Sequence, residues 1–143
     1  MYKNSDPHVG NNSTELWPTS GTGGLSLEIL NALDSTWQKE FQNAVYDWDN
    51  GTPDALTLTV KKGTVDPSCT QVGGLQKVCN NNFGKTGWLG INEILQDTST
   101  GFIQSSVAKM NEYYLHSANA AQRQYTMCHE VSRGGMSVLQ GVL

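Results

Sequence analysis

Apolar residues recur at spacings of three and four along residues 25–48. The positions are Leu30, Leu33, Trp37, Phe41, Ala44, Val45 and Trp48. Residues three and four apart lie on one face of a helix, so this spacing is typical of an amphipathic helix. The turn-forming residues 49–53 follow and end the segment. The pattern predicts one long N-terminal helix with its apolar face toward a core.

Three later segments have patterns that predict strands. Residues 55–60 alternate apolar and polar positions, and residues 87–95 form a second, largely apolar run. Residues 102–110 alternate loosely and carry polar side chains on one side, as an edge strand does. The backbone groups of an edge strand can pair with an extended peptide. A helix followed directly by a strand favours an α/β fold.

The two ends of the chain have a different character. Residues 1–24 are rich in Asn, Ser, Thr, Gly and Pro and show no period, which predicts an irregular arm. Residues 118–130 have helical spacing, so we expect His129 and Glu130 to lie on a helix. Residues 131–143 contain paired glycines, each of which costs a helix about 1 kcal/mol. The chain therefore divides into an arm, a domain at 25–130 and a tail at 131–143.

Composition narrows the class of protein. A length of 143 residues favours one domain, and 37% hydrophobic residues suffice for an ordinary core. The net charge is −4 and the basic residues are scattered, which argues against a nucleic-acid partner. No apolar run approaches the roughly 18 residues that a membrane span needs, so we expect no membrane partner.

The cysteines and sequons favour a secreted protein. Cys69 and Cys79 bracket a short Gly-rich segment and are a candidate disulfide, which leaves Cys128 over. Candidate glycosylation sites are Asn11, Asn12 and Asn50. Residues 1–10 lack the apolar region of a signal peptide, so we expect an extracellular protein from which that peptide was removed. The alternative is a cytosolic chain with reduced thiols.

Residues 127–133 contain the first half of an H-E-x-x-H motif. In the full motif two histidines on one helix face bind Zn²⁺, and the glutamate is a general base toward the metal-bound water. His129 and Glu130 are in place, but the permanent cation Arg133 occupies the second ligand position. His116 lacks ligand spacing. Because catalytic zinc takes about three protein ligands, these residues predict an incomplete site; taken alone, His-Glu also fits a solvated helix face.

From about residue 17 to residue 130 the chain resembles secreted zincin-type zinc metallopeptidases of eukaryotic microbes. The similarity lies in collinear segments at 23–33, 44–51, 53–58, 77–80, 87–93, 106–111 and 124–130. The resemblance implies an α/β fold: a zincin-like N-terminal subdomain with a small twisted mixed sheet, a long N-terminal helix and an active-site helix, the C-terminal subdomain being missing. For the complete family member it implies zinc as cofactor and peptides or proteins as substrates.

In this family the motif continues as H-E-x-x-H-x-x-G-x-x-H. The later motif positions hold Arg133, Met136 and Leu139 here, so only His129 as ligand and Glu130 as catalytic base carry over. The resemblance also implies that a partner of Cys128 belongs to the missing part. It further implies that substrate lies along the predicted edge strand, at Ser105, Ser106, Val107 and Ala108.

Three functional interpretations follow from these residues. The first is a truncated zinc metalloendopeptidase whose present chain is inactive and binds no zinc tightly. The second is a non-catalytic pseudoenzyme or decoy that binds peptides, and the third is a fragment without function. For the break after Glu130 we expect a gene-level cause, because the codons of Val131 and Ser132 can match the start of an intron. Residues 131–143 are then intron read-through; a frameshift or a genuine truncated product is the alternative.

Overall fold

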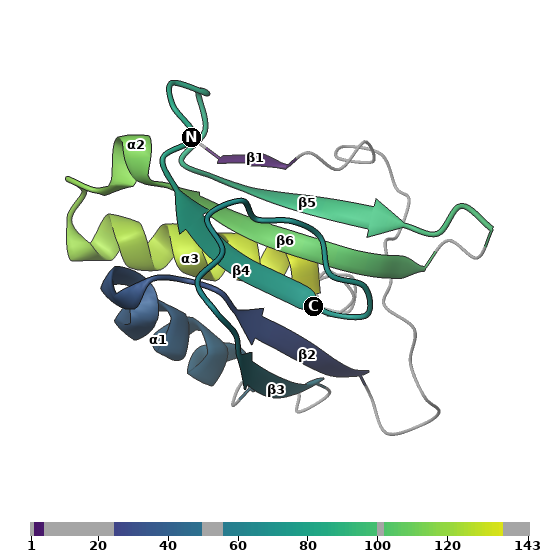
Figure 1. Cartoon of the computed structure of the whole chain (residues 1–143). Coiled ribbons are helices and arrows are strands. Elements are labelled where there is room, and N and C mark those ends of the chain that lie inside the picture. Colours follow the sequence, from purple (N-terminus) through teal and green to yellow (C-terminus); the bar gives the residue numbers. More distant parts are fainter. Residues whose placement is uncertain (1, 5–24, 50–55, 100–101, 136–143) are drawn as a thin grey trace.

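The computed structural model describes residues 2–4, 25–49, 56–99 and 102–135 (Figure 1). Its elements are β1 Tyr2–Asn4, β2 Leu25–Asn31, the 3-10 helix η1 Ser35–Trp37, α1 Gln38–Asp49, β3 Leu56–Lys62, β4 Gln76–Asn81, β5 Gly90–Gln96, β6 Ile103–Asn111, α2 Glu112–Leu115 and α3 Ala120–Gly135. The described chain is thus mixed α/β, as predicted.

The strands form one mixed sheet with the order β1-β5-β6-β4-β2-β3. Strand β2 runs parallel to β3 and β4, and β4 runs parallel to β6. Strand β5 pairs antiparallel with β6, and the three-residue β1 pairs parallel with the outer edge of β5. Among the five longer strands, β5 is therefore at one end of the sheet and runs against its neighbour.

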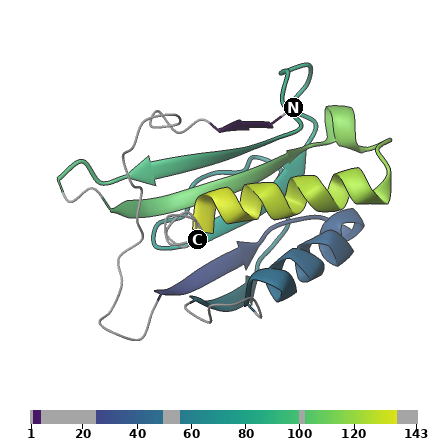
Figure 2. The same ribbon diagram turned by 180° about the vertical axis from the view of Figure 1, so that it is seen from behind.

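Helices α1 and α3 lie side by side against one face of this sheet (Figure 2). Buried apolar side chains fill the space between the helices and the sheet. They include Leu27, Ile29, Trp37, Phe41, Val78, Ile103, Met110, Leu115, Met127 and Val131. Burial of each large apolar side chain stabilises the fold by about 1.5–3 kcal/mol. This core positions α3, which carries the His-Glu pair, against the strands.

The prediction of one helix over residues 25–48 is wrong in its first half. Residues 25–31 form β2, which pairs with β3 on one side and β4 on the other. Leu27 and Ile29 are buried at alternate positions, as one face of a strand requires. The helical segment begins only after Asp34, whose carboxylate accepts a hydrogen bond from the Thr36 amide at 2.9 Å. Strand pairing from distant segments outweighs the local three-and-four spacing.

The segment between the two cysteines runs into strand β4. Five of the six residues of β4 are buried, and the strand lies between β2 and β6. Gln76, Lys77 and Asn80 give it a polar sequence that hides the strand pattern. Each of these side chains finds a hydrogen-bond partner inside the fold.

The segment predicted as an edge strand, β6, is a strand in the middle of the sheet. It pairs with β4 on one side and with β5 on the other. Ser105, Ser106, Val107 and Ala108 are all buried in this central strand, so their predicted position at a sheet edge is wrong. The polar positions of this strand have internal partners: Ser105 Oγ donates to Gln71 Oε1 at 2.6 Å.

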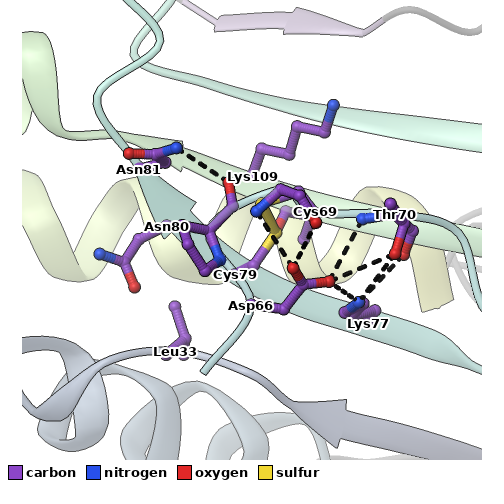
Figure 3. Close-up of a disulfide and its surroundings, with 12 residues drawn as sticks. Leu33, Asp66, Cys69, Thr70, Lys77, Cys79, Asn80, Asn81 and Lys109 are labelled. Atoms are coloured by element: carbon purple, nitrogen blue, oxygen red, sulfur yellow. Dashed lines mark hydrogen bonds and ion pairs between the residues drawn. A yellow bond between two sulfur atoms is a disulfide. The ribbon is translucent and has the colours of Figure 1, made fainter. Parts of the chain in front are cut away.

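The connection between β3 and β4 crosses the sheet face opposite the helices, and a disulfide joins it to β4 (Figure 3). The disulfide links Cys69 to Cys79 with a Cα–Cα distance of 5.8 Å, which confirms the predicted pair. Both cysteines are buried beside Ala32 and Val107 in a second, smaller apolar cluster. A bridge of this kind typically stabilises a fold by about 2–4 kcal/mol. Cys128 lies in α3 and takes no part in a disulfide.

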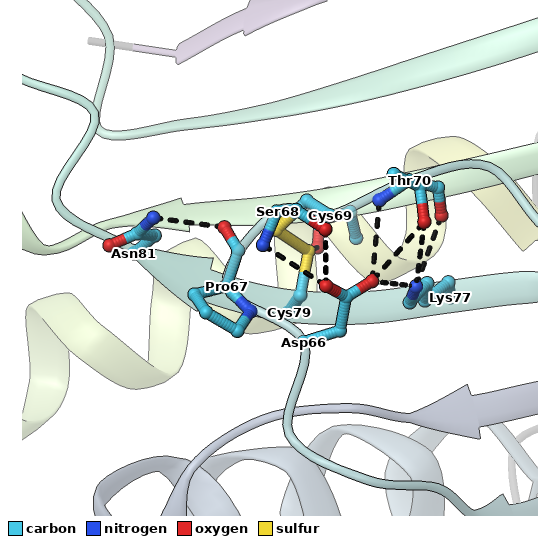
Figure 4. A network of polar contacts seen from close by, with 9 residues as sticks. Asp66, Pro67, Ser68, Cys69, Thr70, Lys77, Cys79 and Asn81 are labelled. Atoms are coloured by element: carbon cyan, nitrogen blue, oxygen red, sulfur yellow. Dashed lines mark hydrogen bonds and ion pairs between the residues drawn. A yellow bond between two sulfur atoms is a disulfide. The ribbon is translucent and has the colours of Figure 1, made fainter.

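A partly buried ion pair stabilises the same connection (Figure 4). The Asp66 carboxylate pairs with the Lys77 ammonium and accepts hydrogen bonds from the Ser68 amide at 3.1 Å and the Thr70 hydroxyl at 3.3 Å. Lys77 Nζ also donates to the Thr70 carbonyl at 3.2 Å, and its side chain is only 5% exposed. The hydrogen bonds from Lys77 and then Ser68 hold the pKa of Asp66 well below its ordinary value.

We expect Asp66→Asn to lower the free energy of unfolding at pH 7 by about 1.5–3 kcal/mol, the range for hydrogen bonds to charged groups. Because the folded-state pKa of Asp66 is depressed, its contribution is fully present above the unfolded pKa, near 4, and is lost as the pH falls toward the folded pKa. The difference between the two proteins should therefore shrink below about pH 4. Urea unfolding at pH 7, 5 and 3 measures it.

The matched control is Asp47→Asn, at an exposed position of α1. It should change the unfolding free energy by less than about 0.5 kcal/mol at each pH. A gap between Asp66→Asn and the unchanged chain that stays constant from pH 7 to pH 3 contradicts the proposed ion-pair linkage.

Candidate functional site

His129 and Glu130 lie in the last two turns of α3, so the prediction that they sit on a helix is confirmed. The helix starts after Asn119, whose side-chain oxygen accepts from the Gln122 amide at 2.8 Å. Its backbone continues past Arg133 to Gly135. Positions 129 and 133 therefore belong to one helix and lie one turn apart on the same face.

The Glu130 side chain packs against the first residue of β5. Glu130 is 1% exposed, and a Cβ added at Gly90 would lie 2.7 Å from Glu130 Cγ and 2.9 Å from Thr126 Cγ2. Contacts this short do not occur at real Cβ atoms, so the approach depends on glycine. The motif glutamate and the outer antiparallel strand, which are far apart in the sequence, are thereby in contact.

Two buried side-chain amides fix the same turns of α3 to the sheet. Asn92 Nδ2, from β5, donates to the Glu130 carbonyl at 2.7 Å. Gln76 Nε2, from β4, donates to the Val131 carbonyl at 3.2 Å, and Gln76 Oε1 accepts from Ser106 Oγ at 3.3 Å. Asn92, Gln76 and Ser106 are fully buried. Breaking such contacts leaves buried polar groups unsatisfied at a cost of about 1–3 kcal/mol each.

His129 lies on a different face of α3 from Glu130. Its half-buried ring stacks on Tyr125, with ring centroids 6.0 Å apart and planes inclined by 18°. Tyr125 is 58% exposed, so this face of the helix is open to solvent. Glu130 and Thr126 instead face β5. The two motif residues thus divide between an accessible face and a buried face of one helix.

The residues present do not fit a catalytic zinc site. Within residues 2–4, 25–49, 56–99 and 102–135 no three His, Cys, Asp or Glu side chains gather closely enough to hold a metal ion. His116 precedes α3 and its Nδ1 lies 3.3 Å from the Glu112 carbonyl oxygen.

Several predicted positions lie outside the described residues. These are the sequons at Asn11, Asn12 and Asn50, and the later motif positions Met136 and Leu139. In the part of the chain that the structure describes, no helix has both the length and the apolar character needed to cross a membrane.

Three residues of this site escape sequence reasoning: Gly90, Asn92 and Gln76. Their sequence signal is weak, because a glycine and two amides within or beside apolar runs resemble interruptions of a strand. Only the contact with α3 explains them: glycine permits close packing, and the amides satisfy helix carbonyls. Of the three, Asn92 lies within a largely apolar run, and an amide in such a run is the feature that points to such a role.

Comparisons with models of protein families, with curated proteins and with solved structures found no match to this chain. The geometry and chemistry of the residues around α3 and β5 are therefore the basis for assigning a function.

We expect Gly90→Ala to lower the free energy of unfolding by about 1–3 kcal/mol, because the added methyl group overpacks the contact with Glu130 and Thr126. Gly73→Ala is the control, since a Cβ there meets nothing within 4 Å. Combining Gly90→Ala with Glu130→Ala should recover part of the loss. If Gly90→Ala and Gly73→Ala are equally stable in urea, the close approach of α3 to β5 is contradicted.

A second prediction concerns the amide contacts. Gln76→Met keeps most of the side-chain volume but removes the donor to Val131 and the acceptor for Ser106. It should lower the free energy of unfolding by about 1–3 kcal/mol in urea. Gln104→Met, at an exposed position of β6, should be close to neutral. A loss no larger than that of Gln104→Met would show that Gln76 does not fasten α3.

Proposed function

We propose that this chain is a zinc metalloendopeptidase-like protein of the zincin type that lacks hydrolytic activity in its present form. His129 and Glu130 take the positions of the first zinc ligand and the general base. Arg133 and Leu139 stand where the second and third ligands belong. The observation that carries the proposal is the contact of Glu130 with Gly90, at the start of the outer antiparallel strand.

Peptide hydrolysis needs an extended main chain held beside a base. The end strand of a sheet can pair with such a peptide through backbone hydrogen bonds, and a general base acts only within hydrogen-bond reach of the reacting group. In this fold the glutamate of α3 lies against β5. The arrangement of sheet, outer strand and helix therefore supports a peptidase ancestry for the site.

Two features argue against hydrolysis by this chain: the zinc ligands are too few, and a substrate has no access to Glu130. Catalytic zinc takes about three protein ligands and keeps one open position, whereas His129 is one ligand and Arg133 brings a fixed positive charge. Glu130 is 1% exposed and is closed to a substrate in this structure. We derive no step through a metal ion for this chain.

A peptide-binding pseudoenzyme is the second candidate function. The observation that favours it is that the outer edge of β5 accepts a strand, because β1 pairs with it in parallel. Backbone pairing at a sheet end needs neither zinc nor Glu130. The chain would then hold extended peptides without cleaving them.

Zinc titration tests the proposed ligand positions. The unchanged chain should show no tight one-to-one zinc binding in calorimetry. Arg133→His places a second imidazole one turn after His129 on α3, and should raise zinc affinity at least tenfold. Arg133→Gln is the control, because it removes the cation without adding a ligand. Peptide cleavage should be undetectable with or without Glu130→Gln.

Two outcomes contradict the proposal. Tight one-to-one zinc binding by the unchanged chain, or a peptidase activity that Glu130→Gln removes, shows that the site is complete. Equal zinc affinity of Arg133→His and Arg133→Gln shows that His129 does not occupy a ligand position.

A further inference from the structure

The first strand of the chain lies along the outer edge of β5 (Figure 1). Tyr2–Asn4 run parallel to β5, with Tyr2 opposite Gly90 and Asn4 opposite Asn92. The residues that begin the chain therefore pair with the strand that Glu130 contacts from the helix side.

Strand β1 pairs with the residues of β5 that contact α3 at Glu130. Its register extends over Gly90–Asn92, the first three of the seven residues of β5. Gly90 touches the Glu130 side chain, and Asn92 donates to the Glu130 carbonyl. An extended peptide that paired with β5 beside Glu130 would need the same backbone edge.

The pairing of β1 is short enough to be displaced. Each backbone hydrogen bond contributes about 0.5–1.5 kcal/mol net, and parallel pairing is slightly weaker per residue than antiparallel pairing. A three-residue strand supplies only a few such bonds. A peptide that pairs with all seven residues of β5 gains more of them.

We propose that β1 is an intramolecular occupant of a peptide-binding edge on β5, and that it must leave before an extended peptide pairs there. The inference rests on the proposed function, since it names the regulation of the same edge. The N-terminal strand thus lowers the affinity of the edge for peptides without touching the ligand positions of α3.

The test uses the full chain with Lys3→Pro and Asn4→Pro together. Backbone N–H groups of successive strand residues point to opposite sides, so one of two adjacent prolines removes a donor that faces β5. The control, Lys3→Ala with Asn4→Ala, keeps both N–H groups. The probe is a fluorescein-labelled peptide with the sequence of residues 1–8, and binding is followed by fluorescence anisotropy.

The proline variant should bind this probe at least tenfold more tightly than the unchanged chain or the alanine control. Hydrogen exchange of those backbone amides in Gly90–Asn92 that face β1 should become at least tenfold faster in the proline variant and slow again when the probe is added. Equal probe binding by the proline and alanine variants overturns the proposal. Faster exchange without probe binding also overturns it, because the edge then does not accept a peptide.

The readout requires neither zinc nor hydrolysis. A negative result therefore rules out that β1 blocks the edge of β5. It does not bear on the ligand positions of α3, which the zinc titration tests. Conversely, equal zinc affinity of Arg133→His and Arg133→Gln rules out the metallopeptidase-like assignment. The probe experiment then still tests whether β5 binds peptides and whether β1 blocks that binding.

Discussion

The rest of the structure depends on the hydrogen bonds by which two buried side-chain amides hold α3 against the sheet. Asn92 donates to the Glu130 carbonyl and Gln76 donates to the Val131 carbonyl, so strands β5 and β4 both bind the last turns of the helix. Buried amides and carbonyls are costly without partners, which makes this docking specific in register as well as favourable. Glycine at position 90 lets the helix approach closely enough for the bonds to form. The place of the His-Glu pair follows from this docking.

This docking places the side chains of the two motif residues, His129 and Glu130, in different surroundings. Glu130 is held under β5, whereas His129 stacks on Tyr125 on the accessible face of the helix. A metal site on that face would require a further ligand one turn later, where Arg133 stands. The proposed binding of a peptide without cleavage requires only the backbone of the outer strand β5.

Local pattern predicts α3 as far as Glu130 but not its continuation through the paired glycines to Gly135. It also predicts the strands β3, β5 and β6 and the Cys69–Cys79 bridge, because each depends on residues close in sequence. It fails for β2, where the alternation of Leu27 and Ile29 coincides with helical spacing and only pairing with β3 and β4 decides the outcome. It fails for β4, whose polar side chains have partners elsewhere in the fold. It also mistakes β6 for an edge, since strand order is set by non-local pairing. The half motif is visible in sequence, but its contact with Gly90 is not.

The contact of α3 with β5 can be measured by a nuclear Overhauser experiment on isotope-labelled protein, which reports proximity between the α-protons of Gly90 and the γ-protons of Glu130. We expect a strong cross-peak for this pair, and another between Gly90 and the Thr126 methyl group. Well-resolved Glu130 signals that show cross-peaks to solvent-facing residues of α3 and none to Gly90 would contradict this contact, because the glutamate would then lie away from β5.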